Sequence, residues 1–412
     1  MRSDDPLAGV PLLDEAAVAP DSRWIFSAGF NTGPDLGDTG RVDAELADLR
    51  RLSDAGARVA LLSHQGSSRD GTAIELDHVA RYLSRRLGRP VGYHPGAVGG
   101  SALRAAGLMR AGDIVLFGNT RLLPGEEDGD LALARQLARL GDQVAVGGFS
   151  KAHRAHASNC GLLRHLPGHA ADSLVREIRF LAPWAGRPPG GFSAAVLGGS
   201  KPEKTLIGLR HFSRAYDLVI PGGVVLNTVL RALGHGIGRS ALGSRPDACA
   251  RAAEAVLAAE GGATLHVPGT VLVVRAGERR AFPVRVTDGV PADCAIVDFV
   301  IRPWAVDLLR GAARAVVAGP PSLCRDGHTE ASYTVLSALE GGNGSALLLG
   351  GDTVRELPWS GLSSTGGGSA LEFLSENTCA VLDELRANRL TTAHRTGGAR
   401  PSLYPPTDRS TE

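Results

Sequence analysis

The 412-residue chain contains very little lysine, since only three of its 44 Lys and Arg residues are lysines. Aromatic residues make up 5% of the chain, and its five cysteines form no CxxC pair. Scattered cysteines favour reduced thiols, and with a polar N-terminus they predict a cytoplasmic protein. No apolar run approaches the roughly 18–20 residues of a membrane span, so we expect no membrane partner. A formal net charge of +1 excludes a globally basic surface, and we expect no nucleic-acid partner.

Small and apolar residues are abundant, with 54 glycines and 43% hydrophobic residues. A chain of this length exceeds a single ordinary core and predicts two domains. Apolar runs such as Ala57–Ser63 and Asp113–Phe117 alternate with helical stretches such as Leu76–Leu87. This alternation predicts parallel βαβ units. The expected fold class is α/β, with two Rossmann-like, doubly wound parallel-sheet domains joined by a hinge.

The proline- and glycine-rich stretch Gly186–Gly191 is the best candidate for the boundary between these domains. We therefore predict an N-terminal domain over residues 1–186 and a C-terminal domain over residues 187–377. A C-terminal helix with a flexible tail is expected over residues 378–412.

Basic side chains follow three predicted strands of the first half. His64 follows the strand Ala57–Ser63, Arg121 follows Asp113–Phe117, and Arg154 follows the strand at Gln143–Val146. Ligands of parallel sheets bind beyond the carboxyl ends of the strands. We therefore expect these three side chains to converge on one rim.

The stretch Ser193–Thr205 combines a strand end, the glycine turn Gly198-Gly199 and a helix start with Lys201 and Lys204. This arrangement gathers backbone N–H groups and the positive end of a helix dipole, which suits a phosphate. Further glycine turns lie at Gly350–Thr353 and Gly366–Gly368. A carboxylate beside lysines and backbone donors suits a nucleotide with Mg²⁺, so Asp352 is the candidate metal ligand.

Together these motifs resemble the phosphoglycerate kinase family over nearly the whole chain. The strings that carry the resemblance are VALLSHQG (Val59–Gly66), GNTRLLPGEE (Gly118–Glu127), AHRAHAS (Ala152–Ser158), LGGSKPEKT (Leu197–Thr205), LGHGIGRS (Leu233–Ser240), GGDT (Gly350–Thr353) and STGGGSALEFL (Ser364–Leu374). The resemblance implies reversible phosphoryl transfer between ATP and the carboxylate of 3-phosphoglycerate, with 1,3-bisphosphoglycerate and ADP as products. It also implies a monomer whose N-terminal domain binds the acid substrate and whose C-terminal domain binds MgADP or MgATP.

The resemblance also implies a role for each candidate residue. Arg41, Lys204, Lys201, Gly367 and Gly368 would be catalytic. The implied acid-binding residues are Asn31, Arg41, His64, Arg121 and Arg154. The implied nucleotide-binding residues are Gly198, Gly199, Lys201, Lys204, Gly222, Gly350, Gly351, Asp352 and Thr353.

The chain departs from the family pattern mainly where the acid would bind. The family carries an arginine and an aspartate where this chain has Ser27 and Gly29, and another arginine at Ser67, although Arg69 is near. Two alternatives therefore stay open. One is a related kinase that acts on another phosphorylated or phosphonate carboxylic acid in a specialised pathway. The other is a weakened nucleotide-binding protein on the same fold.

Overall fold

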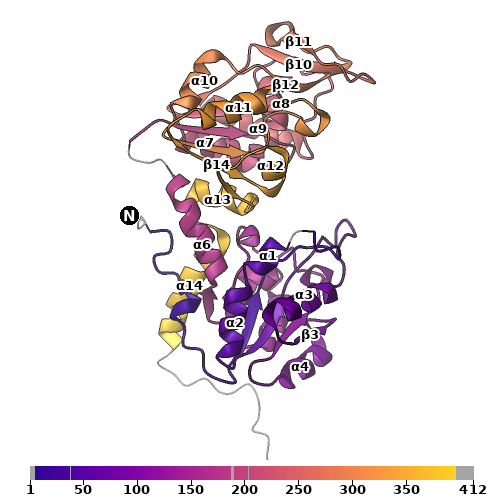
Figure 1. Ribbon diagram of the computed structural model, residues 1–412, viewed down its shortest axis with the longest axis vertical. Helices are drawn as coiled ribbons and strands as arrows, with labels where there is room; N and C mark the ends of the chain where they lie inside the picture. The colour runs from indigo at the N-terminus through magenta and orange to yellow at the C-terminus, as the bar shows by residue number, and fades with distance from the viewer. Residues whose placement is uncertain (1–4, 38, 187–189, 203, 396–412) are drawn as a thin grey trace, which may run out of the picture. The chain divides into compact units, whose positions relative to one another are not determined.

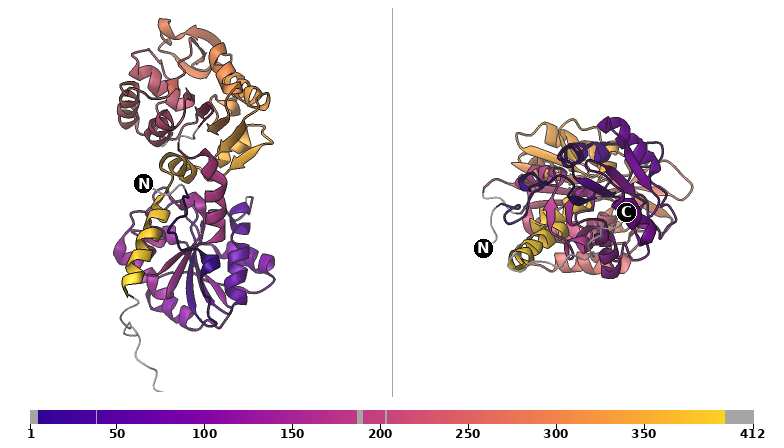
Figure 2. Two further views of the ribbon diagram at one scale, coloured as in Figure 1. Left: turned by 90° about the vertical axis from the view of Figure 1, so that its left-hand side faces the viewer. Right: turned by 90° about the horizontal axis from the view of Figure 1, so that it is seen from below.

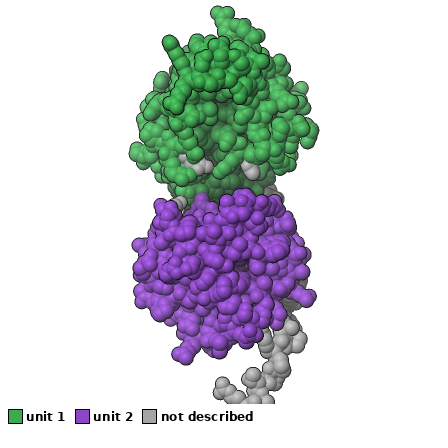
Figure 3. All heavy atoms as spheres, turned by 90° about the vertical axis from the view of Figure 1, so that its right-hand side faces the viewer, with its two compact units in different colours: residues 1–6, 149–153, 174–379 green, residues 7–148, 154–173, 380–412 purple. Residues whose placement is uncertain are grey.

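The computed structural model describes residues 5–37, 39–186, 190–202 and 204–395, without the side chains of Asp352 and of residues 389–395. The chain forms two compact units (Figures 1 and 3). Unit 1 comprises Met1–Pro6, Phe149–His153 and Leu174–Cys379; unit 2 comprises Leu7–Gly148, Arg154–Ser173 and Ala380–Glu412. The domain boundaries predicted after residues 186 and 377 stay predictions, and the boundary segment falls partly outside the described residues. The tail over residues 396–412 lies outside them as well.

Unit 2 is built on a six-stranded sheet in the order β3-β4-β2-β1-β5-β6, in which all neighbouring strands are parallel. Apolar residues run almost without interruption along the inner strands, as expected for strands buried on both faces. The strands are β1 (Arg23–Ser27), β2 (Arg58–Leu62), β3 (Val91–His94), β4 (Ile114–Phe117), β5 (Gln143–Val146) and β6 (Gly168–Ala170).

Helices cover both faces of this sheet (Figure 2). Leu49, Leu52 and Leu83 are buried with Trp24 and Phe26 of β1 in one apolar core, because each helix turns one apolar stripe inward. The α-helices are α1 (Gly40–Asp43), α2 (Leu46–Asp54), α3 (Asp77–Leu87), α4 (Gly99–Gly107), α5 (Leu131–Leu137) and α14 (Ala380–Arg395). Shorter turns are the 3₁₀-helices η1 (Leu13–Glu15), η2 (Thr120–Leu122) and η3 (Ala138–Leu140) and the π-helix η5 (Ala157–Gly161).

Unit 1 contains a second six-stranded parallel sheet, in the order β15-β14-β13-β7-β8-β9. Its strands are β7 (Ser193–Leu197), β8 (Leu218–Pro221), β9 (Thr264–Leu265), β13 (Arg314–Ala318), β14 (Ser345–Leu349) and β15 (Leu362–Ser364). A separate antiparallel sheet has the order β11-β10-β12. Its strands are β10 (Thr270–Arg275), β11 (Phe282–Arg285) and β12 (Cys294–Phe299).

The helices of unit 1 connect these strands and bury a second apolar core, which includes Leu226 and Leu230 under the sheet residues Val196 and Ile220. The first two residues of α6 (Asp172–Leu181) belong to unit 2 and the rest to unit 1. The other α-helices are α7 (Arg210–Ala215), α8 (Gly223–Ala232), α9 (Pro246–Leu257), α10 (Pro303–Arg310), α11 (Glu330–Glu340), α12 (Gly351–Glu356) and α13 (Gly368–Glu376). Shorter turns are η4 (Phe149–Lys151), η6 (Ala182–Trp184), the π-helix η7 (Lys204–Leu209), η8 (Val286–Asp288) and η9 (Cys324–Asp326).

The predicted α/β class with two Rossmann-like parallel sheets is confirmed, whereas the hinge stays a prediction. Strand order reverses at the β1/β5 pair in unit 2 and at the β7/β13 pair in unit 1. Such switch points leave a crevice at the carboxyl ends of the strands, where ligands of this fold bind. Within the described residues, no helix combines the length and the apolar character needed to cross a membrane.

Candidate active site

The connections after β1, β2 and β4 meet beyond the carboxyl ends of the unit 2 sheet. The Asn31 backbone N–H donates to the His64 carbonyl (2.9 Å), and the Gly66 N–H donates to Asn31 Oδ1 (3.1 Å). The Thr120 N–H donates to the Ser63 carbonyl (3.0 Å). These bonds place Asn31, His64 and the GNTR motif on one rim, although they are far apart in the sequence.

Asn119 is a residue of the candidate site that sequence reasoning missed, although it lies within the GNTR motif. Its Oδ1 accepts from the backbone N–H groups of Arg121 (2.9 Å) and Gln65 (3.2 Å). Its side-chain amide donates to the carbonyls of Gln65 and Ile74, both at 2.8 Å. Asn119 therefore ties the loop after β2 to η2 and fixes the backbone that carries Arg121.

Arg121 is almost completely buried, with 3% of its side chain exposed. Its Nη1 donates to Glu127 Oε1 (2.5 Å) and to the Gly66 carbonyl (3.4 Å). Its Nε is buried and has no hydrogen-bond partner among the described residues. A guanidinium fixed along one edge keeps its other donors available for a ligand anion.

The remaining candidates for acid binding also lie in unit 2. Arg41 is in α1, the helix that follows β1, and its Nε is buried without a hydrogen-bond partner among the described residues. Arg154 follows β5, and its carbonyl accepts from the side-chain amide of Asn159 (2.7 Å) in η5. The structure thus places all five predicted acid-binding residues in connections that follow β1, β2, β4 and β5.

In unit 1, the glycine turns after β7 and β8 pack against the Pro320-Pro321 turn that follows β13. A Cβ added to Gly198 would lie under 3.0 Å from the Pro320 backbone, and one added to Gly222 would overlap Pro321 in the same way. By contrast, a Cβ at Gly199 or Gly351 would meet no heavy atom within 4 Å. Motif reasoning assigns all these glycines one role, whereas the structure separates those that let backbones pack from those that face open space.

Two of the three lysines of unit 1, Lys201 and Lys204, follow the open glycine turn in the sequence. Lys201 is exposed, and the Lys204 backbone N–H donates to its carbonyl (3.1 Å). Lys204 begins the π-helix η7, which continues as α7, where the sequence predicts one regular helix over Thr205–Phe212. π-helical turns are rare and occur frequently at functional sites.

The GGDT turn forms the start of α12. Gly350 is the N-cap of this helix, and the buried Thr353 hydroxyl donates to the Leu349 carbonyl (2.7 Å). The hydroxyl hydrogen of Thr353 is therefore used in a bond to the last residue of β14. Asp352 belongs to α12, but its side chain lies outside the described part of the structure.

The glycine run before α13 packs against the segment Phe149–His153, which belongs to unit 1. A Cβ at Gly366 would overlap the Phe149 ring, and one at Gly368 would lie 3.0 Å from His153 Nε2. His153 Nδ1 lies 2.6 Å from the Ser369 hydroxyl. The AHRAHAS motif, which the sequence presents as one string, is therefore divided between the units after His153.

A half-buried carboxyl group, that of Glu177, supports the same glycine run. The Ser364 hydroxyl donates to Glu177 Oε1 (2.5 Å) and accepts from the Gly366 N–H (3.0 Å). Burial raises the pKa of Glu177, and the hydrogen bond from Ser364 opposes that rise. Glu177 carries no motif signal in the sequence, and only the fold connects it with this site.

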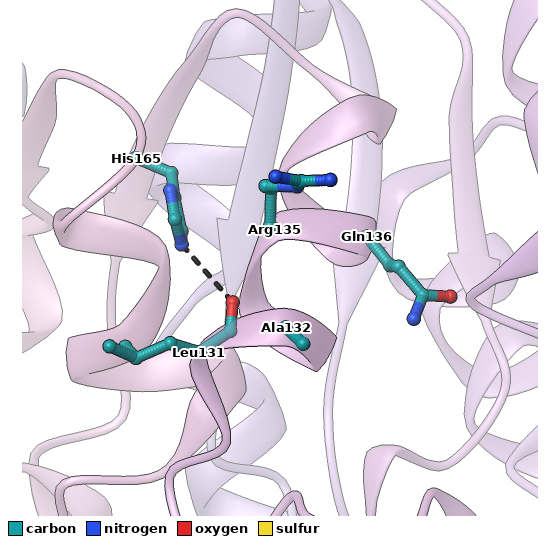
Figure 4. A pocket seen from close by; sticks show the side chains of 5 residues that line it. All are labelled: Leu131, Ala132, Arg135, Gln136 and His165. Carbon is teal, nitrogen blue, oxygen red and sulfur yellow. Dashed lines mark hydrogen bonds between the residues drawn. The ribbon is translucent and has the colours of Figure 1, made fainter.

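A shallow pocket elsewhere on unit 2 contains no candidate residue. It is lined by Leu131, Ala132, Arg135, Gln136 and His165 (Figure 4). His165 Nε2 lies 3.3 Å from the Leu131 carbonyl, the contact drawn in Figure 4. The candidate residues therefore lie at the strand ends and not in this pocket.

Comparisons with known proteins agree with this arrangement. The family model described as Phosphoglycerate kinase matches residues 26–377. The chain is 33% identical over 371 residues to a phosphoglycerate kinase of Moorella thermoacetica, covering 86% of this chain and 93% of that protein. It is 32% identical over 405 residues to one of Mesorhizobium japonicum, covering 92% of this chain and 100% of that protein.

Two solved structures share the fold. Phosphoglycerate kinase from Coxiella burnetii superposes with a TM-score of 0.70 at 24% identity, covering 92% of this chain and 100% of that chain. Phosphoglycerate kinase from Pyrococcus horikoshii superposes with a TM-score of 0.73 at 22% identity, covering 92% of this chain and 99% of that chain.

Proposed function

The chain belongs to the phosphoglycerate kinase family, and from that premise we propose how its residues perform the family's reaction. The protein transfers a phosphoryl group reversibly between ATP and the carboxylate of 3-phosphoglycerate, forming 1,3-bisphosphoglycerate and ADP. The residue assignment rests on one observation: different kinds of residue lie at the strand ends of the two sheets. Basic groups gather at the strand ends of unit 2, and glycine turns with lysines at those of unit 1. Neither alternative function gains support from the comparisons.

We assign the acid substrate to Asn31, Arg41, His64, Arg121 and Arg154 of unit 2. A phosphorylated acid carries negative charge at both ends, so it requires several fixed donors and cations. Arginine suits this role because its guanidinium is always charged and matches the geometry of phosphate and carboxylate.

We assign the nucleotide to the loops of unit 1, with Lys201, Lys204, Gly199, Gly350 and Gly351 beside the phosphates. Backbone N–H groups at these turns donate to phosphate oxygens without a side chain in the way. Gly198 and Gly222 contribute by letting the neighbouring loops approach one another. Thr353 contributes by fixing the start of α12 to β14.

We further propose Mg²⁺ as the partner of the nucleotide, with Asp352 as its protein ligand. The described residues hold no cluster of three or more His, Cys, Asp or Glu side chains able to bind a metal. Mg²⁺ is usually held by one or two carboxylates together with water and substrate phosphates, so a single aspartate is enough on the protein side. When bound, Mg²⁺ neutralises charge on the phosphate oxygens.

The transfer step needs little covalent chemistry from the protein. Negative charge is spread over the transferring phosphoryl group, and Arg41, Lys204 and the backbone N–H groups of Gly367 and Gly368 would stabilise it. The acid carboxylate must also reach the terminal phosphorus with water excluded, which the predicted hinge would permit. We also propose that the protein acts as a monomer in the cytoplasm, in line with its five free cysteines.

A coupled assay with 3-phosphoglycerate, ATP and Mg²⁺ tests the proposal. We expect turnover of about 1–100 s⁻¹ or faster. Turnover only with another phosphorylated or phosphonate acid would favour the related kinase. Nucleotide binding without turnover on any acid would favour the weakened binding protein.

A further inference from the structure

Glu127 contacts both the buried arginine of the acid site and the loop beside it. One carboxylate oxygen, Oε1, accepts from Arg121 Nη1 (2.5 Å). The other, Oε2, accepts from the hydroxyls of Ser67 (3.0 Å) and Ser68 (3.4 Å). Only 15% of the Glu127 side chain is exposed, so the carboxylate is held in a largely dry environment between these groups.

The loop that Glu127 holds is a closed turn. The Ser67 N–H donates to the Thr72 hydroxyl (3.0 Å), and the Thr72 N–H donates back to the Ser67 carbonyl (3.1 Å). The Gly66 carbonyl at its start accepts from Arg121 Nη1 (3.4 Å), while the Gly66 N–H donates to Asn31 (3.1 Å). The turn has a carboxylate of its own, Asp70, which accepts from the Thr72 N–H (3.0 Å) and hydroxyl (2.6 Å). Glu127 is the carboxylate that bonds directly to Arg121, in a network that joins the connections after β1, β2 and β4.

The nitrogens of the Arg121 guanidinium are not used equally in this network. Both of its bonds to Glu127 and Gly66 use Nη1, and its Nε is buried without a partner among the described residues. A buried donor without an acceptor is costly, so this atom is ready for an acceptor supplied by a ligand. The phosphate or carboxylate oxygens of the acid substrate have the charge and geometry that a guanidinium donor prefers.

We propose that Glu127 is a positioning residue of the acid-substrate site. It fixes the plane of the Arg121 guanidinium and the Ser67–Thr72 turn, so that the unused edge of Arg121 meets the anionic end of the acid. Glu127 does not itself contact the substrate, because a carboxylate would repel that anion. The proposal rests on the proposed function, since it takes the ligand of this rim to be 3-phosphoglycerate.

The neighbouring residue Asp128 provides a matched control. Its side chain is 73% exposed and pairs with Arg69, which is 67% exposed (2.6 Å). Arg69 also lies 4.0 Å from Glu127, between its Nε and Oε2. Exposed ion pairs contribute little, so removing the Asp128 charge leaves the bonds of Glu127 to Arg121 and to the two serines in place. Asp128 and Glu127 are adjacent acids in the same loop, and only Glu127 contacts Arg121.

The test compares Glu127→Ala, Glu127→Gln and Asp128→Asn with the wild type. Binding of 3-phosphoglycerate is measured by calorimetry without nucleotide, beside the KM of each substrate and the melting temperature. In Glu127→Ala we expect acid binding weakened about tenfold or more, because a hydrogen bond to a charged group is lost. The KM for ATP should stay within about twofold, as expected for a role confined to the acid rim. Glu127→Gln should be intermediate, and Asp128→Asn should match the wild type.

Unchanged or tighter acid binding in Glu127→Ala would overturn the proposal, since Glu127 would then only neutralise Arg121. Equal weakening of both substrates would show a merely structural role and overturn it too. If Glu127→Ala fails to fold, the isosteric Glu127→Gln variant distinguishes the same outcomes. Because acid binding is measured without transfer, a wild type that binds 3-phosphoglycerate but does not turn it over would refute the proposed function alone.

Discussion

At the scale of single residues, the proposed reaction depends on cations that each unit holds in place. Arg41 lies one turn before α2, and Lys204 begins η7. Neither position is explained by packing of apolar groups. Under the proposed function, both cations would face the charge of a transferring phosphoryl group.

Replacing either cation should slow transfer. For Arg41→Ala and Lys204→Ala we expect the barrier to rise by about 2–4 kcal/mol, as when one preorganised donor is removed from a site. The kcat at saturating substrates measures this. Arg81→Ala, which removes an exposed arginine paired with Asp77 on α3, is the control. Rates within threefold of wild type for both active-site variants would remove the two assignments.

Gly66 has a residue-scale constraint of its own, because its φ of +66° and its surroundings both exclude a side chain. A Cβ there would lie under 3.0 Å from the Thr72 backbone. Gly66→Ala should therefore open the turn, weaken acid binding and destabilise the protein by about 1–3 kcal/mol.

Gly71 is the matched control for this substitution. Its φ is +70°, yet an added Cβ would meet nothing within 4 Å. Gly71→Ala should show only the smaller cost of the backbone conformation, about 1 kcal/mol. Melting temperatures and the KM for the acid distinguish the two, and equal effects would mean that the overlap with Thr72 is relieved at no cost.

At the scale of elements, the start of α2 is tied to the places where the chain leaves unit 2. The buried Glu45 accepts from the Gly148 N–H and from the Ser173 hydroxyl, both at 2.7 Å. Gly148 and Ser173 are each the last residue of unit 2 before the chain enters unit 1. One turn further, Asp48 accepts from the Asp172 N–H (2.8 Å) at the first residue of α6.

Removing the Glu45 carboxylate should break its hydrogen bonds with Gly148 and Ser173, the two places where the chain leaves unit 2. In Glu45→Ala, the half-buried Gly148 N–H would lose its acceptor, at a cost of about 1 kcal/mol. We expect lower stability in urea and a fall in kcat, since Arg41 lies four residues away. Asp54→Ala, which removes an exposed partner of Arg89, is the control. Wild-type stability and kcat in Glu45→Ala would show that these contacts do not hold the start of α2 in place.

At the scale of the whole molecule, the reaction requires both reactants within bonding distance while each binds its own unit. If the predicted hinge exists, neutralising the cations of both units should favour a more compact protein. We expect the radius of gyration from X-ray scattering to fall with ADP and 3-phosphoglycerate together, by more than with either alone. An identical scattering curve with both ligands would contradict the hinge.

Much of the fold follows from local sequence pattern. Strand β5 has the predicted bounds Gln143–Val146, because an apolar run between turn residues specifies a buried strand without knowledge of the rest of the chain. The short strands β6, β11 and β15 were not predicted, because their few residues carry no distinct periodicity. Their existence depends on the neighbouring strand that each one pairs with.

The sequence by itself determined the two parallel sheets, the family, and the rim to which His64 and Arg121 belong. Only the tertiary structure decided that Phe149–His153 lies with unit 1, and that Gly198 packs against Pro320 while Gly199 faces open space. It alone placed Arg121 against Glu127. The physical reason is that a strand or helix start is specified by adjacent residues, whereas burial and ion pairing depend on residues that the folded chain brings together.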